Sequence, residues 1–195
     1  MKIFIATPCY NSQVHAEMVQ SLLQIQNVHF DWYTTSSSIL SFNRNKSVKK
    51  FLESGYEWLM FWDADISIDS TYGFYIQDMI NFAYKKECKI VGIPCRLKVK
   101  EEVYNCQIEK ENITELPIEP FKVRVIGTGI MLIHCSVFET LEAPWFQFVD
   151  TKEGFYPEDW NFCEKCATIT PIYAYPLPVK HFGLTSYENY RNPSL

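Results

Sequence analysis

The sequence is poor in positive charge, with 18 Lys and Arg against 23 Asp and Glu in 195 residues and a net charge of -5. Proteins that hold a nucleic-acid backbone by charge carry the opposite sign, so we expect no nucleic-acid partner. Long apolar runs are lacking too. None reaches the ~18 residues of a membrane-spanning helix, and the first residues lack the apolar core of a secretion signal. We therefore expect a soluble, cytoplasmic protein with no membrane span.

Disulfide patterning is also absent. The seven cysteines are odd in number and follow no framework spacing, which is typical of reduced thiols in a cytosol-like compartment. Cys163 and Cys166 have CxxC spacing, but no second pair accompanies them and they fall in an expected helix, so we interpret both as packing residues. The 47% apolar and 21% charged content indicates a packed core, and the length suits one domain, residues 1–195.

Strand and helix patterns alternate along the chain. The predicted strands cover residues 2–7, 28–35, 57–62, 89–93, 122–133 and 172–175, and the predicted helices cover 14–26, 41–54, 72–83, 135–141 and a stretch from 157. This order predicts an α/β fold, Rossmann-like, with a mainly parallel central sheet flanked by helices. The mixed-charge segment 96–119 is expected to form hairpins or surface loops. Two glycines at 127 and 129 predict a bend or a close backbone approach.

The most informative junction is the end of the apolar run 57–62, where Asp63-Ala64-Asp65 follows. Such a run predicts a strand covered on both faces, and ligands bind at the carboxyl edge of open α/β sheets. Two carboxylates just beyond a strand end can turn toward one hard cation, and oxygen ligands favour Mg²⁺ or Mn²⁺ over zinc. The alternative is an acidic loop that is only solvated or caps the next helix.

Two sharper alternatives share this segment. An EF-hand loop starting at Asp63 is excluded because its sixth position is Ile68 instead of Gly and its twelfth is Phe74 instead of Glu. A hydrophobic strand ending in Asp-x-Asp also resembles the haloacid-dehalogenase-type phosphatase motif, in which Asp63 would be the nucleophile. That motif normally lies near the N-terminus and continues into Thr, whereas here Ile66-Ser67 follows. The phosphatase remains the alternative function.

Three further groups of residues have both a structural and a functional interpretation. Glu158 and Asp159 open an expected helix, where acids either favour the helix dipole or supply a general base for a sugar hydroxyl. His181 is either structural or a third metal ligand through its neutral imidazole. Arg44 and Lys46, near a helix start, suit a phosphate group or form an ordinary solvated helix end.

Five short motifs follow one another in a defined order. They are Ala6-Thr7-Pro8-Cys9-Tyr10-Asn11, Asn43-Arg44-Asn45, Phe61-Trp62-Asp63-Ala64-Asp65, Gly127-Thr128-Gly129 with Met131-Leu132-Ile133, and Pro157-Glu158-Asp159-Trp160. In content and order the chain resembles the GT-A fold glycosyltransferases, especially small members similar to glycosyltransferase family two. The five motifs are similar to that family's nucleotide loop, basic motif, DxD motif, glycine-bearing strand beside the acceptor, and ED motif.

The resemblance implies a nucleotide-sugar donor, preferably a UDP-sugar, bound by about residues 1–95, and a glycan or other hydroxyl acceptor bound by about residues 96–195. It implies nucleotide contacts from Thr7, Pro8, Tyr10, Arg44, Asp63, Ala64 and Asp65, and ligation of Mn²⁺ or Mg²⁺ by Asp63, Asp65 and His181.

The mechanism that the resemblance implies is inverting displacement. Asp159, with Glu158 as second candidate, would deprotonate the acceptor hydroxyl, and the metal would neutralise charge on the leaving group. The chain lacks the C-terminal helices of polymerising relatives, which favours transfer of a single sugar. A phosphatase using Asp63, or an inactive domain that only binds a nucleotide-sugar, stays open as an alternative.

Overall fold

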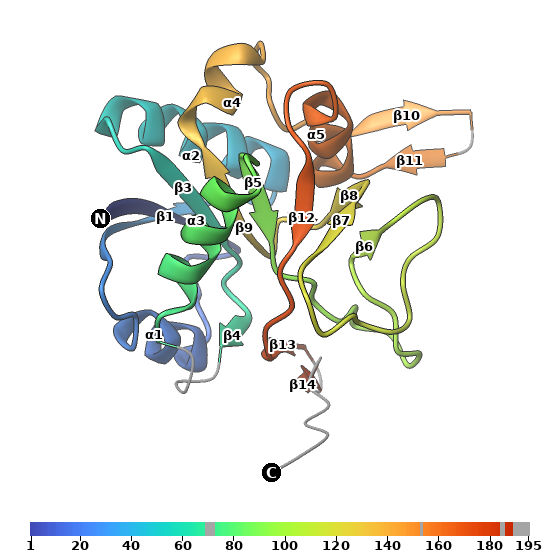
Figure 1. The fold of residues 1–195 in the computed structure, drawn as a ribbon, viewed down its shortest axis with the longest axis horizontal. Coiled ribbons are helices and arrows are strands. Elements are labelled where there is room, and N and C mark those ends of the chain that lie inside the picture. The colour runs from blue at the N-terminus through green and yellow to red at the C-terminus, as the bar shows by residue number, and fades with distance from the viewer. Residues whose placement is uncertain (69–72, 153, 184–185, 189–195) are drawn as a thin grey trace.

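The centre of the protein is a seven-stranded sheet in the order β2-β1-β3-β9-β5-β12-β7 (Figure 1). The computed structural model describes residues 1–68, 73–152, 154–183 and 186–188. The strands are β1 (Lys2–Cys9), β2 (His29–Ser36), β3 (Trp58–Trp62), β5 (Ile90–Gly92), β7 (Phe121–Val123), β9 (Ile130–His134) and β12 (Ile172–Ala174). β1, β2, β3, β5 and β12 run in one direction, and β7 and β9 run in the other. The predicted α/β class with a mainly parallel sheet is confirmed.

Helices cover both faces of the sheet. They are α1 (Ala16–Leu23), α2 (Leu40–Ser54), α3 (Tyr75–Lys85), α4 (Cys135–Thr140) and α5 (Glu158–Cys166). Side chains alternate across each strand, so in β1 Ile3 and Ile5 pack with α1 and α3 while Phe4 and Ala6 pack with α2, α4 and α5. Residue 72, where the third helix was predicted to begin, lies outside the described residues.

Strand β9 corrects the expectation for residues 122–133. This segment forms three short strands instead of one interrupted strand: β7, β8 (Val125–Ile126) and β9. β9 lies antiparallel between β3 and β5, where every residue from Ile130 to Ile133 is fully buried. The two glycines before it make the predicted close approach, since a Cβ at Gly129 would lie 2.7 Å from the Cδ1 of Ile66.

The ends of two N-terminal elements also differ from the prediction. β1 continues through Pro8 to Cys9, whereas the prediction ended it at residue 7. β3 pairs only with residues 3–6 of β1, so β1 has a free edge at Pro8, where proline is tolerated. α2 begins at Leu40 rather than being capped by Ser41, and it ends as predicted at Gly55, whose φ of 72° is a left-handed C-cap.

A smaller three-stranded sheet adjoins the carboxyl edge of the central one. It comprises β4 (Ile66–Ile68), β13 (Val179–Phe182) and β14 (Ser186–Glu188). β13 pairs antiparallel with β4, with His181 opposite Ile66, and the backbone N–H of Phe182 donates to the carbonyl of Asp65 at 2.8 Å. This register brings a residue near the C-terminus beside the end of β3.

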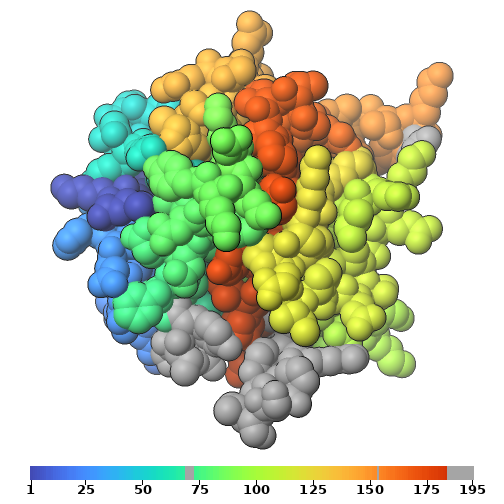
Figure 2. Space-filling model, in the orientation of Figure 1, coloured from blue at the N-terminus to red at the C-terminus, as the bar shows by residue number. Residues whose placement is uncertain are grey.

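The segment 96–119 was predicted to form hairpins or surface loops, and it contains two antiparallel bridges, Arg96 with Tyr104 and Gln107 with Asn112, but part of it also enters the core. Strand β6 (Cys106–Gln107) pairs with β8, and the side chains of Tyr104 and Cys106 are buried in the core cluster under α5. Figure 2 shows residues 100–125, coloured light green to yellow, as a continuous block beside the orange residues of the later part of the chain. The remaining strands, β10 (Val149–Thr151) and β11 (Gly154–Tyr156), form a hairpin.

All seven cysteines are unpaired. Cys163 and Cys166 are fully buried on α5, and burial raises the pKa of Cys163 well above the usual thiol value. Their interpretation as packing residues is confirmed. Within the described part of the chain, no helix combines the length and the apolar character needed to cross a membrane.

Candidate active site at the carboxyl edge of the sheet

A cleft of about 870 Å³ opens where β1, β2 and β3 end. Pro8 lines it at the end of β1 and Tyr10 just beyond, Ser37 and Ser38 line it after β2, and residues 63–65 line it after β3. Parallel strands end at the same edge, which explains why segments so far apart in sequence share one cleft. The cleft therefore gathers the first and third motifs of the sequence.

Thr7 does not line this cleft, unlike the other residues predicted near the nucleotide base. Its side chain is fully buried, and its hydroxyl accepts a hydrogen bond from the indole N–H of Trp32 at 2.9 Å. Tyr10, in contrast, is 65% exposed at the mouth of the cleft. The structure thus divides the first motif into a buried residue and an exposed one.

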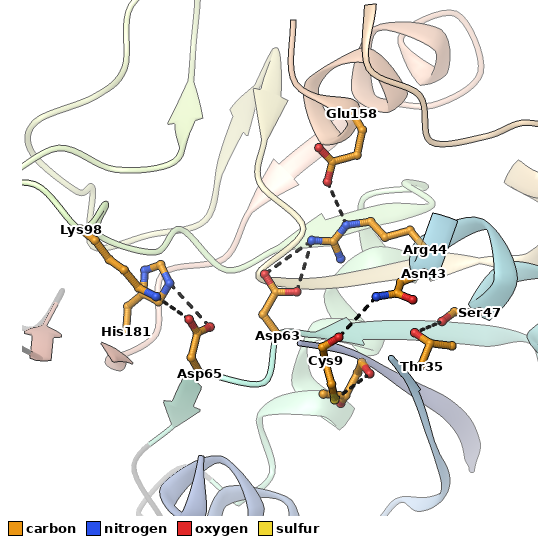
Figure 3. A network of polar contacts seen from close by, with 11 residues as sticks. Cys9, Thr35, Asn43, Arg44, Ser47, Asp63, Asp65, Lys98, Glu158 and His181 are labelled. Atoms are coloured by element: carbon orange, nitrogen blue, oxygen red, sulfur yellow. Dashed lines mark hydrogen bonds and ion pairs between the residues drawn. The ribbon is translucent and has the colours of Figure 1, made fainter. Parts of the chain in front are cut away.

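Arg44 lies on the inner face of α2, and its side chain is only 2% exposed. Its Nε donates to Oε1 of Glu158 at 3.1 Å, and its Nη2 donates to Oδ1 of Asp63 at 3.2 Å (Figure 3). The guanidinium also lies 5.2 Å from the ring centroid of Phe61. We call Arg44, Asp63 and Glu158 the inner cluster. The interpretation of Arg44 as a solvated helix end is wrong.

The charges of the inner cluster depend on one another. Burial opposes the charge of Arg44, but the carboxylates of Asp63 and Glu158 outweigh it and raise the pKa of Arg44. Burial also raises the pKa of Asp63 to about 7, against the opposing effect of Arg44. The backbone N–H of Asp63 donates to the carbonyl of Gly129 at 2.7 Å, which ties the end of β3 to β9.

Asp65 points away from the inner cluster and meets a second set of side chains (Figure 3). The Lys98 ammonium contacts Oδ2 of Asp65, and Nε2 of His181 lies 3.7 Å from Oδ1. Nδ1 of His181 lies 2.9 Å from the carbonyl oxygen of Arg96, a partner that can only accept, so Nδ1 carries the proton. Burial lowers the pKa of His181, which favours the neutral ring. We call Asp65, Lys98 and His181 the outer cluster.

The three predicted metal ligands are not brought together as a set. Among the described residues, no three His, Cys, Asp or Glu side chains are grouped to hold a metal ion, because Asp63 faces Arg44 instead. The pair of Asp65 and His181 does fit a divalent cation. Its neutral imidazole presents the unprotonated Nε2 toward the carboxylate, and a backbone carbonyl orients the ring from behind. Magnesium sites commonly use one or two carboxylates and complete their coordination with substrate phosphates.

Asp159 opens α5 beside the inner cluster. Its Oδ1 accepts the backbone N–H of Trp160 at 2.8 Å, and burial followed by the nearby Glu158 charge raises the pKa of Asp159 to about 6. A backbone hydrogen bond from Thr128 also reaches Asp159. Two buried polar atoms in this region, Oγ1 of Thr128 and Nη1 of Arg44, have no hydrogen-bond partner among the described residues. A buried polar atom without a partner is costly, so these two atoms lower the stability of this region.

Sequence reasoning missed two residues at the site. His15 lines the cleft, donates its backbone N–H to the carbonyl of Ala64 at 2.7 Å, and stacks on Phe182 with ring centroids 3.9 Å apart. Lys98 belongs to the segment that was expected to form hairpins or surface loops. Neither residue lies in a motif or at a recurrent spacing, so the sequence contained no signal for either.

Comparisons with known proteins identify the fold in which this site lies. No family model and no curated protein matches the chain. Among solved structures, A197 from STIV superposes with a TM-score of 0.70 at 21% identity, covering 94% of this chain and 86% of that one. The chain has the GT-A fold. The resemblance to GT-A glycosyltransferases that the five motifs indicate is thereby confirmed for the fold.

Two other solved structures share the GT-A fold with this chain. S. aureus TarS, residues 1–349, has a TM-score of 0.52 at 16% identity. The superposition covers 89% of this chain and 58% of the TarS chain. A UDP-glucose pyrophosphorylase complexed with UDP-glucose has a TM-score of 0.56 at 11% identity, with 96% and 92% of the two chains covered. These identities establish the fold and leave the activity to the residues of the site.

Proposed function

We propose that the protein is a metal-dependent glycosyltransferase that moves a sugar from a nucleotide-sugar, preferably a UDP-sugar, to an acceptor hydroxyl. One observation carries this proposal: Arg44 bonds both Asp63 and Glu158, which lie 19 and 114 residues away in the sequence. The motif predicted for the donor and the motif predicted for the acceptor therefore meet at one buried cation. A site for group transfer needs this convergence.

The donor side of the proposed reaction lies in the cleft that Tyr10 and residues 63–65 line. Its volume of about 870 Å³ is within the range of small-molecule sites. Asp65 and His181 would hold Mn²⁺ or Mg²⁺, which supplies Lewis-acid neutralisation of the charge that develops on the nucleoside diphosphate. The geometry supports an indirect role for Arg44 besides any contact with the nucleotide, because Arg44 holds the Asp63 carboxylate in position.

The acceptor side favours Asp159 over Glu158 as the general base. Glu158 is buried and accepts a hydrogen bond from Arg44, so protonating it would leave the buried guanidinium with one carboxylate fewer. Asp159, whose pKa is raised to about 6, is deprotonated at neutral pH and still basic enough to take a proton from a hydroxyl. Attack on the anomeric carbon from the side opposite the diphosphate inverts its configuration.

The phosphatase alternative fits this geometry less well. A nucleophilic Asp63 would need a free oxygen aimed at a phosphorus atom. Its two carboxylate oxygens instead lie 3.2 and 3.5 Å from Nη2 of Arg44. The inactive-domain alternative makes the same binding predictions as the enzyme and differs only in turnover.

The proposal is tested by calorimetric titration of the protein with a panel of UDP- and GDP-sugars, first with Mn²⁺ and then with EDTA. We expect binding of one donor that requires the metal, and loss of this metal-dependent binding in Asp65→Asn. The matched control is Asp150→Asn, an exposed carboxylate on the β10–β11 hairpin, which should bind as the wild type does.

Three outcomes separate the remaining functions. If the folded protein binds no nucleotide-sugar, the glycosyltransferase proposal is rejected. Binding with neither transfer to an acceptor nor slow hydrolysis of the donor indicates an inactive domain. Formation of a UDP-sugar and diphosphate from UTP and a sugar 1-phosphate would instead indicate nucleotidyl transfer on the same fold.

A further inference from the structure

The outer cluster already contains a cation. The Lys98 ammonium contacts Oδ2 of Asp65, while Nε2 of His181 lies 3.7 Å from Oδ1 of the same carboxylate. The ammonium thus engages one of the two Asp65 oxygens that could ligate a divalent cation (Figure 3). Two cations on one carboxylate repel each other, so both cannot occupy Asp65 at full strength.

The loop that carries Lys98 also orients the His181 ring. Residues 96–104 form a closed loop: Arg96 and Tyr104 form an isolated bridge, and the N–H of Leu97 donates to the carbonyl of Val103 at 2.8 Å. The carbonyl of Arg96 accepts the Nδ1 proton of His181. The backbone two residues before Lys98 is therefore anchored to the imidazole, and the long side chain starts from a defined position beside it.

The Lys98 side chain is nevertheless able to leave. The side chains of Lys98 and Asp65 are 35% and 39% exposed, in contrast to the nearly inaccessible Arg44. Ion pairs at such exposure are weak because water screens them, and the four-carbon stem of lysine is flexible. An exchange of Lys98 for another cation at Asp65 therefore costs little.

We infer that Lys98 is a resident counter-ion of Asp65 that competes with the divalent cation and is displaced when metal and nucleoside diphosphate bind together. The inference rests on the proposed function because it takes Asp65 and His181 as the metal ligands. Asp65 lines the cleft and Lys98 contacts it, so a displaced ammonium stays within reach of the cleft, where the diphosphate offers it a new partner. Metal and diphosphate consequently bind cooperatively: the diphosphate removes the competitor.

The test measures Mn²⁺ binding directly, from the electron paramagnetic resonance signal of free Mn²⁺, without nucleotide. Lys98→Met keeps the side-chain length and removes the charge, and we expect it to bind Mn²⁺ about two to five times more tightly than wild type. The matched control is Lys100→Met, an exposed lysine on the same loop, with wild-type affinity. Addition of UDP should then strengthen Mn²⁺ binding more in the wild type than in Lys98→Met.

Each contrary result is distinct. Equal Mn²⁺ affinity of Lys98→Met and wild type, or weaker binding by the variant, overturns the inference and leaves the glycosyltransferase proposal intact if UDP-sugar binding and transfer persist. Absence of Mn²⁺ binding in every protein, with and without UDP, overturns it as well and indicates a metal-independent site. If the wild type binds no UDP-sugar, the proposed function itself is rejected.

Discussion

The inner and outer clusters each pair an aspartate with a basic side chain, but in different surroundings. Asp63 and Asp65 are two positions apart, yet Asp63 turns toward α2 and α5 while Asp65 turns toward β13 and the 96–104 loop (Figure 3). In the inner cluster the side chains of Arg44, Glu158 and Asp63 are 2%, 4% and 27% exposed, whereas those of Lys98 and Asp65 in the outer cluster are 35% and 39% exposed. A buried charge must keep its partner, but an exposed one can exchange it. The inner cluster therefore organises the site, and the outer cluster is suited to binding.

The largest effect is expected at Asp159, which belongs to neither cluster. Asp159→Asn should lower sugar transfer by about 10²–10⁴-fold because the general base is lost, while donor binding is retained. Glu158→Gln, its neighbour in the inner cluster, still accepts a hydrogen bond from Arg44 and should lower transfer less. Steady-state kinetics and calorimetry on both variants measure the contrast.

The pH profile provides an independent check of Asp159. With a pKa near 6, the base becomes protonated as the pH falls, so kcat/KM of the wild type should decrease about tenfold per pH unit below pH 6. Undiminished transfer by Asp159→Asn would assign the base to another group.

The second effect concerns stability. Arg44→Met leaves the buried Glu158 and the partly exposed Asp63 without their cation, so the free energy of unfolding should fall by about 3–5 kcal/mol. Lys98→Met, the corresponding change in the outer cluster, should stay within about 0.5 kcal/mol of wild type. Urea denaturation compares the two. A loss below about 1 kcal/mol in Arg44→Met would show that the inner cluster does not depend on its cation.

The same contrast explains what sequence alone predicts. The apolar run 57–62 and the helix opening at Glu158 were predicted because burial on both faces and helical periodicity are local patterns. The antiparallel direction of β9 was not predicted, because a strand buried on both faces has the same apolar pattern in either direction. The burial of Arg44 was missed because a basic residue near a helix start is usually solvated.

The directions in which the Asp63 and Asp65 side chains point could not be predicted from the sequence, for a further reason. Strand alternation ends at Trp62, so nothing local decides which way Asp63 or Asp65 turns. Their directions depend on partners contributed by distant segments, namely Arg44 on α2 and Lys98 on a loop without a motif. Contacts of this range are set by tertiary packing, which a single sequence does not report.

The smallest expected effect concerns the pH dependence of stability, to which the two clusters contribute differently. Burial raises the pKa of Asp63 from 3.8 to about 7, so the folded protein binds a proton more tightly than the unfolded chain between these values. Stability should therefore fall as pH rises from about 4 to about 7 and level off above, with Asp159 adding a smaller slope that ends near pH 6.

Asp63→Asn removes the larger of these two contributions. Between pH 5.5 and pH 8 the free energy of unfolding should decrease by roughly 1–2 kcal/mol more in wild type than in Asp63→Asn, measured by urea denaturation at both pH values. Asp65→Asn, the matched variant of the outer cluster, should retain most of the wild-type slope, because burial is the largest cause of the raised pKa of Asp63 and the Asp65 charge is a lesser one. Identical slopes in wild type and Asp63→Asn would mean that Arg44 keeps Asp63 ionised throughout, and the inner cluster would then be a fully charged triad whose stability does not depend on pH in this range.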